Sequence, residues 1–147
     1  MIKIFTIVVV MDVYLQDQKE IICLMPCLYQ FEKNGYFVQA VLGFTKDEFI
    51  FFNDHAPDKV IKKKGYMYHA KVKFNFNDYG KVMVEKIVGL QLAYVNRLRF
   101  ITKDGQKQFV VYYYKKDEKM IKIFLEALAN RKFDIVKKKI EFDSVLD

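Results

Sequence analysis

Tryptophan is absent from the 147 residues of this chain, and proline and glycine are scarce, with 2 Pro and 6 Gly. This scarcity, together with the lack of a low-complexity tract or an internal repeat, argues against a disordered linker. Aromatic residues are abundant instead, with 14 Phe and 10 Tyr, and hydrophobic residues make up 52% of the chain. We therefore expect one domain with a single core and many β-strands.

Cysteine is also scarce. The 2 cysteines, Cys23 and Cys27, have neither the CxxC spacing nor the neighbouring histidines of a zinc or redox site. On a strand, four residues span about 13 Å, which is too far for a disulfide between the two thiols. We expect both thiols to be buried, in a protein of the reducing cytoplasm.

Long hydrophobic runs are missing, and the nearest approach to one is residues 1–11. This run ends at Asp12, so it is shorter than the roughly 20 apolar residues of a membrane span, and no small-x-small cleavage site follows it. Its β-branched residues favour a buried strand, and a short helix through Tyr14 and Leu15 is the alternative. Both conformations stay open for residues 1–18.

From Ile21 onwards, apolar runs alternate with turn signals. Asn34-Gly35 and Asp104-Gly105, each between two apolar runs, are strong signals of β-hairpins. In residues 66–76, apolar and polar side chains alternate strictly, which predicts one face in the core and one in water. The expected strands are 21–31, 36–44, 49–52, 66–76, one or two within 82–94, 97–102 and 106–114. The side chains expected on one side of 82–94 are Val88, Leu90, Leu92 and Tyr94.

The period of the pattern changes near residue 117. Asp117 and Glu118 place acidic side chains where a helix N-terminus favours them, and residues 130–132 suit a C-terminal turn. The apolar residues between them follow helical spacing: Ile121, Phe124, Leu125 and Leu128. We expect one amphipathic helix packed on the sheet. For residues 133–147, a helical extension and an extended arm both stay open.

About seven strands in hairpin order followed by one capping helix is the element order of the pleckstrin-homology superfold. Residues 41–52, an apolar strand, a Thr-containing turn and a short aromatic strand, resemble its bacterial and GRAM-type members. The spaced apolar residues Val84, Ile87 and Leu90 and the hairpin 98–105 are similar to them as well.

The resemblance covers about residues 19–132 and implies a fold class. That fold is mainly β (α+β), a pleckstrin-homology-like barrel of about seven antiparallel strands capped by one C-terminal helix. Residues 1–18 would then be an N-terminal apolar segment, and residues 133–147 a tail or an extension of the helix.

A basic rim is the first candidate site. The resemblance places the loops 33–35 and 53–65 at one open end of the barrel, where relatives bind lipid headgroups. The lysines on this rim would be Lys33, Lys59, Lys62, Lys63 and Lys64. Each ammonium group contributes about 1 kcal/mol near an anionic surface. The alternative is a solvated loop, partly neutralised by Asp54 and Asp58 and without an arginine to bind phosphate bidentately.

A surface for self-association is the second candidate site. Residues 110–114 are apolar on both faces of their strand, so the N-terminal segment or a second copy of the chain must cover the face outside the barrel. We predict self-association. The residues that we assign to it are Val8, Val9, Val10, Tyr112 and Tyr114.

Nucleic acid is not an expected partner, although the net charge is +7. The rings in 66–76 lie on the face opposite the lysines and so belong to the core. The basic residues 131–132 and 137–139 are expected to contact the helix C-terminal carbonyls or to face water, with nucleic acid or a membrane as the alternative.

Motifs for catalysis are missing. There is no Gly-rich phosphate loop, no GxSxG and no HExxH. His55 beside Asp54 and Asp58 is expected to be incidental, and nothing specific joins a cysteine to a histidine. We therefore expect no enzyme, no metal and no cofactor. The predicted function is a binding or assembly module for a protein partner or a second copy. The alternative is an adaptor that binds anionic phospholipid headgroups or another acidic surface, with peripheral membrane contact.

Overall fold

The computed structural model describes residues 14–15, 20–52, 67–68, 71–89 and 94–141. Eight strands form one sheet in the order β10-β7-β8-β9-β2-β3-β4-β6. Their bounds are β2 Cys23–Tyr29, β3 Val38–Phe44, β4 Glu48–Phe52, β6 Val72–Asn75, β7 Tyr79–Val88, β8 Val95–Thr102, β9 Gln108–Tyr114 and β10 Asp134–Glu141. A second, two-stranded sheet pairs β1 (Tyr14–Leu15) with β5 (Met67–Tyr68) in parallel.

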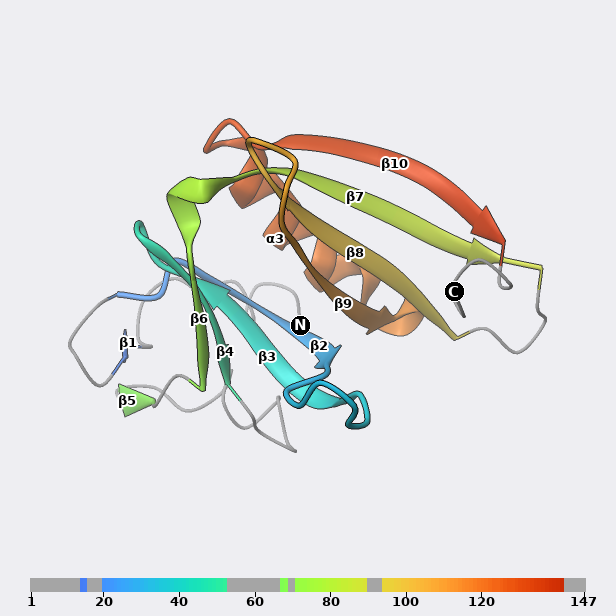
Figure 1. Ribbon diagram of the computed structural model, residues 1–147, viewed down its shortest axis with the longest axis horizontal. Helices are drawn as coiled ribbons and strands as arrows, with labels where there is room; N and C mark the ends of the chain where they lie inside the picture. The colour runs from blue at the N-terminus through green and yellow to red at the C-terminus, as the bar shows by residue number, and fades with distance from the viewer. Residues whose placement is uncertain (1–13, 16–19, 53–66, 69–70, 90–93, 142–147) are drawn as a thin grey trace.

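The large sheet bends into two halves (Figure 1). Strands β2, β3, β4 and β6 form one half, and β7, β8, β9 and β10 form the other. The halves meet where β2 and β9 pair at a single position, Leu28 with Tyr112. On the far side, β6 runs through the 3-10 turn η1 (Phe76–Asp78) directly into β7, and the Asn75 side chain accepts a hydrogen bond from the Asn77 backbone N–H at 2.9 Å.

The fold class agrees with the prediction. Seven strands pair in antiparallel fashion, and one helix, α3 (Glu118–Ala129), follows them. This mainly β architecture is consistent with a pleckstrin-homology-like barrel capped by a helix. Both hairpin signals lie in strand connections, the first in the loop between β2 and β3 and the second, with Gly105 at φ 75, between β8 and β9.

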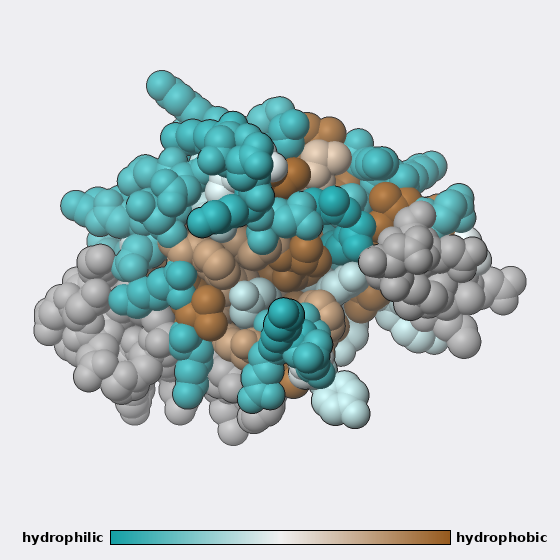
Figure 2. Space-filling model, viewed as in Figure 1, coloured by the Kyte–Doolittle hydropathy of each residue, from teal (hydrophilic) through white to brown (hydrophobic). Residues whose placement is uncertain are grey.

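Aromatic side chains fill the space between the halves. The Phe49 ring lies 4.9 Å from Phe76, 5.3 Å from Phe100 and 5.5 Å from Phe109, centroid to centroid. Phe100 and Phe109 stack at 4.5 Å. Such pairs contribute about 0.5–1.5 kcal/mol beyond the area they bury, so these ring contacts add to the stability of the core. In Figure 2, apolar side chains show between the two halves, and hydrophilic ones gather over β7 and β10.

Helix α3 buries the predicted stripe against the sheet. Ile121, Phe124 and Leu128 are at most 1% exposed, and the Phe124 ring packs edge-on against Phe44 at 5.3 Å. Past the helix, the Arg131 guanidinium donates to the Ala127 carbonyl at 3.2 Å, as expected for a basic residue at a helix C-terminus.

After the helix the chain reverses into β10. Lys132 has a φ of 70°, the left-handed conformation that ends many helices. Of the two alternatives for the tail, residues 134–141 take the extended one and pair with β7 in parallel, from Asp134 beside Lys81 to Glu141 beside Val88. This eighth strand lies outside the seven expected.

Two expected strands differ from the structure. The run 66–76 is not one strand, because β6 covers only Val72–Asn75 and Phe76 opens the turn η1 that leads into β7. Its alternation holds in the described part, with Lys71, Lys73 and Asn75 exposed. Tyr94 was expected on the same side of a strand as Val88, Leu90 and Leu92. It lies outside the strands and is 66% exposed, since β7 ends at Val88 and β8 begins at Val95. Leu90 and Leu92 lie outside the described residues.

Candidate functional site

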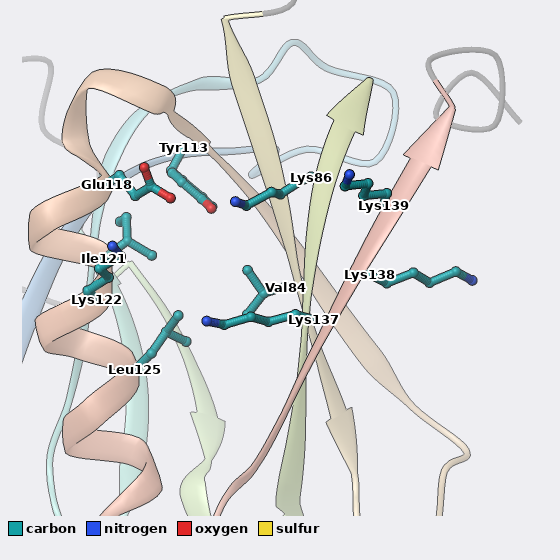
Figure 3. Close-up of a pocket in the computed structure, with 10 residues that line it drawn as sticks. All are labelled: Val84, Lys86, Tyr113, Glu118, Ile121, Lys122, Leu125, Lys137, Lys138 and Lys139. Atoms are coloured by element: carbon teal, nitrogen blue, oxygen red, sulfur yellow. The ribbon is translucent and has the colours of Figure 1, made fainter. Parts of the chain in front are cut away.

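A groove lies between α3 and the sheet edge formed by β7 and β10 (Figure 3). The parallel pairing sets Val84 beside Lys137 and Lys86 beside Lys139. Because side chains alternate across a strand, these four residues share the sheet face on the side of α3. Glu85, between Val84 and Lys86, belongs to the opposite face.

The bottom of the groove is apolar. Val84 is 5% and Ile121 is 1% exposed, and Leu125 lies half-buried one helical turn after Ile121. Together with the ring of Tyr113 they line a pocket of about 350 Å³. A volume in this range suits a small ligand or the end of a larger one.

Tyr113 is held in place by a buried amide. The Asn96 side chain donates to the Tyr113 hydroxyl at 3.4 Å and accepts from the Ile87 backbone N–H at 3.1 Å. Burial raises the pKa of the Tyr113 phenol, so it stays protonated at neutral pH. A protonated hydroxyl that accepts from Asn96 can still donate to a ligand.

Lysines dominate the charge of the groove. Those that line it are Lys86, Lys122, Lys137, Lys138 and Lys139, and the acidic lining residue is Glu118. All five lysines are exposed. Lys86 and Lys137 point toward α3 in Figure 3, whereas the Lys138 side chain points away. We call this site the lysine groove.

The lysines are not neutralised within the described part of the chain. There, the ion pairs of 4.0 Å or less join Lys73 to Glu48 and two arginines to Glu85, and none includes a groove lysine. Glu118 stands in the first turn of α3, four residues before Lys122, where the helix dipole and that lysine both favour it. Lys138 points away from the groove, so the other four lysines against one glutamate leave a formal surplus of three positive charges among the described lining residues.

The opposite face of β7 carries charge in a different way. Glu85 is 2% exposed and accepts from Arg97 Nε at 2.7 Å and from Arg99 at 3.1 Å. Arg97 pairs across the strands with Tyr112, whose ring meets Phe37 edge-on at 5.0 Å. Here the charged groups bind one another.

An aromatic surface adjoins this ion cluster. Tyr36 is 91% exposed and Phe37 is 42% exposed, both in the loop before β3, and Tyr112, whose ring contacts Phe37, is half-buried. We call Tyr36, Phe37, Arg97 and Tyr112 the aromatic–arginine surface. Tyrosine, phenylalanine and arginine are enriched in protein–protein interfaces.

The predicted sites fall partly within the described residues. Lys33 is exposed in the loop between β2 and β3. The other rim lysines, Lys59 and 62–64, lie outside the described residues, so the basic rim stays a prediction. Tyr112 and Tyr114 are half-buried on β9, and Val8, Val9 and Val10 lie outside the described residues. Self-association therefore stays a prediction as well.

Both cysteines are buried and unpaired. Burial raises the pKa of the Cys23 thiol to about 12, and burial raises the pKa of the Cys27 thiol further. Because the thiolate is the reactive form, neither group is poised for nucleophilic chemistry at neutral pH.

Metal ligands do not cluster in the described residues, where no three His, Cys, Asp or Glu side chains are close enough to share an ion. His55, Asp54 and Asp58 lie outside them. Within the same residues, no helix has the length and apolar character needed to cross a membrane.

The sequence did not lead us to predict the lysine groove. The run 137–139 stood out as basic, but we assigned it to helix-end or solvent contacts. The groove depends on the pairing of β10 with β7, which brings Lys137 and Lys139 beside Val84 and Lys86. The sequence signal nearest to the groove is the basic run 137–139, which follows soon after a helix with an exposed Lys122.

Comparison with known proteins gives little beyond this geometry. No family model matches the chain, and no curated protein matches it. Among solved structures, a structure of Vav1 inhibited by an allosteric inhibitor is similar at a TM-score of 0.48 and 10% sequence identity. The match covers 80% of this chain and 20% of that one. Similarity at this level says nothing about the partner or the activity of this protein.

Proposed function

We propose that this protein is a non-catalytic binding module of the cytoplasm that holds an anionic partner in the lysine groove. The observation that carries the proposal is the convergence of lysines from β7, β10 and α3 on one groove without an ion pair among the described residues. The pleckstrin-homology-like architecture, typical of binding modules, is compatible with this role.

Electrostatics supports an anionic partner. Lysines that share one groove repel each other, and a bound anion offsets this repulsion because each ammonium group attracts it. Each Lys close to an anionic surface contributes about 1 kcal/mol at moderate salt. Several acting together suffice for measurable affinity, and their effect weakens as salt screens them.

Binding rather than catalysis is favoured by the chemistry of the site. Among the described residues, the charged and polar groups that line the groove are lysines, one carboxylate and a phenol, without a cysteine or histidine. The two thiols are buried in β2 with raised pKa values and do not line the groove. A lysine cluster on an apolar floor holds and orients an anion without a nucleophile beside it.

The test is a titration with tripolyphosphate followed by amide chemical shifts. We expect shifts in β7, β10 and α3, with an affinity that falls as salt rises. The variant Lys86→Glu/Lys137→Glu should reduce the affinity at least tenfold. The matched control Lys46→Glu/Lys71→Glu, with the same change in net charge at exposed positions away from the groove, should change it less than threefold. Equal losses in the two variants would show that only net charge matters.

A second candidate function is protein–protein interaction or self-association through the aromatic–arginine surface. It is favoured by the exposure of Tyr36 and Phe37 next to Tyr112. Size-exclusion chromatography with light scattering at low and high salt tests self-association. A salt-stable oligomer that dissociates in Tyr36→Ser/Phe37→Ser would support it, and a monomer at all salt concentrations would contradict it.

A further inference from the structure

The lysine groove separates apolar from charged groups. Val84, Ile121 and Leu125 form its floor, while the ammonium groups of Lys86 and Lys137 extend over it from the sheet side (Figure 3). A compact inorganic ion would contact the ammonium groups and leave the exposed part of the Leu125 side chain in water. A ligand that satisfies both parts of the groove must carry an anionic group and an apolar chain.

The charged groups also give the ligand a direction. Glu118 lies at the first turn of α3, and the surplus of lysines lies across from the helix, at Lys86, Lys137 and Lys139. An anionic head is repelled by Glu118 and attracted to the sheet side. Its chain then lies over the floor, along α3 toward Leu125.

The chemistry of the head follows from the donors present. Arginine, whose planar fork favours bidentate contacts to carboxylate or phosphate, is not among the described residues that line the groove. Lysines act as point charges with rotatable donors, and the protonated Tyr113 hydroxyl adds a neutral donor. This set suits a compact, strongly charged head such as a phosphate monoester, whose oxygens accept from several directions.

We infer that the lysine groove binds a single-chain amphiphilic anion, with its phosphate between Lys86, Lys137 and Lys139 and its alkyl chain over Val84, Ile121 and Leu125. The inference rests on the proposed function, which it extends from any anion to one that carries a chain. A volume of about 350 Å³ accommodates one short chain rather than a bulky ligand.

Four probes separate head from chain: octyl phosphate, inorganic phosphate, octyl glucoside and octyltrimethylammonium, each below its micelle concentration. We expect octyl phosphate to bind at least tenfold more tightly than inorganic phosphate, since burying methylene groups adds to the contacts of the head. The neutral and cationic probes should show no shifts in β7, β10 and α3. Equal binding of all octyl probes would overturn the inference.

Variants locate the two parts of the ligand. Leu125→Asn should weaken octyl phosphate at least tenfold and leave inorganic phosphate within twofold. Leu125→Ala, a milder change, is the second variant, and thermal unfolding checks that both fold. Lys86→Glu/Lys137→Glu should weaken both ligands, and Lys46→Glu/Lys71→Glu neither.

The outcomes with these probes distinguish a failure of this inference from a failure of the proposed function. If inorganic phosphate binds in the groove as tightly as octyl phosphate, the chain plays no part and the inference fails while the proposed function stands. If no anion shifts the groove residues, both fail. Vesicles containing lysophosphatidate, a phosphate monoester with one chain, distinguish a membrane lipid from a soluble amphiphile. If the protein co-sediments with these vesicles and Lys86→Glu/Lys137→Glu abolishes the co-sedimentation, the ligand is a membrane lipid. If the protein binds octyl phosphate but not the vesicles, the ligand is a soluble amphiphile.

Discussion

The two faces of β7 carry charge in opposite ways. On one face Glu85 is buried and bound by Arg97 and Arg99 at 2.7 Å and 3.1 Å. On the other face the next residue, Lys86, joins lysines of β10 and α3 without an ion pair among the described residues. Charges that bind one another hold the sheet together, whereas charges of one sign left facing a groove are available for a ligand.

The largest effect on stability is expected on the face of β7 where Glu85 is paired with the two arginines. Glu85→Ala leaves the guanidinium groups of Arg97 and Arg99 without their carboxylate, so we expect the free energy of unfolding to fall by about 3 kcal/mol. Urea unfolding followed by circular dichroism measures it. Lys86→Ala is the matched control on the next residue and should stay within about 0.5 kcal/mol. Similar losses in the two variants would refute the contrast between the faces.

A smaller effect on stability is expected at Lys132, where the chain reverses between α3 and β10. Lys132 has a φ of 70°, which is costly for a β-branched side chain and free of cost for glycine. We expect Lys132→Val to lose about 1–2 kcal/mol of unfolding free energy, and Lys132→Gly to lose none. The same urea unfolding curves test this. A loss in the glycine variant as large as in the valine variant would argue that the lysine side chain matters and not the backbone.

Neutralising the unpaired face should have the opposite sign. Lys86→Gln/Lys137→Gln removes repulsion in the groove, so we expect a gain of up to about 0.5 kcal/mol at low salt. Because salt screens the same repulsion, the gain should vanish by about 0.5 M salt. Thermal unfolding at both salt concentrations checks it. A loss of stability at low salt would mean that these lysines are paired after all.

The smallest effect on stability is expected from the two cysteine thiols, which lie on neither face of β7. Burial raises the pKa of the Cys23 thiol from its ordinary value of 9.0 to about 12. The folded thiol therefore keeps its proton where an unfolded thiol begins to lose it, and this contribution to stability is lost as pH rises from about 9 toward 12. At pH 8 a disulfide reagent should label neither cysteine in the folded protein and both in urea. Rapid labelling of the folded protein would contradict the burial.

Local patterns predicted most of the fold. Alternation, the two Gly-containing turns and the helical spacing of Ile121, Phe124 and Leu128 indicated the strands and the helix, because each signal lies within a few neighbouring residues. The pairing of β10 with β7 joins segments far apart in the sequence, and no local period encodes a parallel partner. Residues 134–141 also show only weak alternation, with three successive lysines.

The candidate site was harder to predict for the same reason. Lys137 and Lys139 were visible as a basic run, but their meaning depends on Val84 and Lys86 lying beside them, which only the register provides. The aromatic–arginine surface could be predicted only in part, because the sequence indicated Tyr112 as an apolar residue on the outer face of its strand. Its neighbour Phe37 lies in the loop before β3 and gave no sign of the contact.

The most direct test of the central claim is the titration of octyl phosphate into the intact chain and into Lys86→Glu/Lys137→Glu, followed by amide chemical shifts. We predict shifts confined to β7, β10 and α3 in the intact chain, and an affinity at least tenfold lower in the variant. Shifts located elsewhere, or an affinity that the variant leaves unchanged, would contradict the assignment of the lysine groove as the binding site.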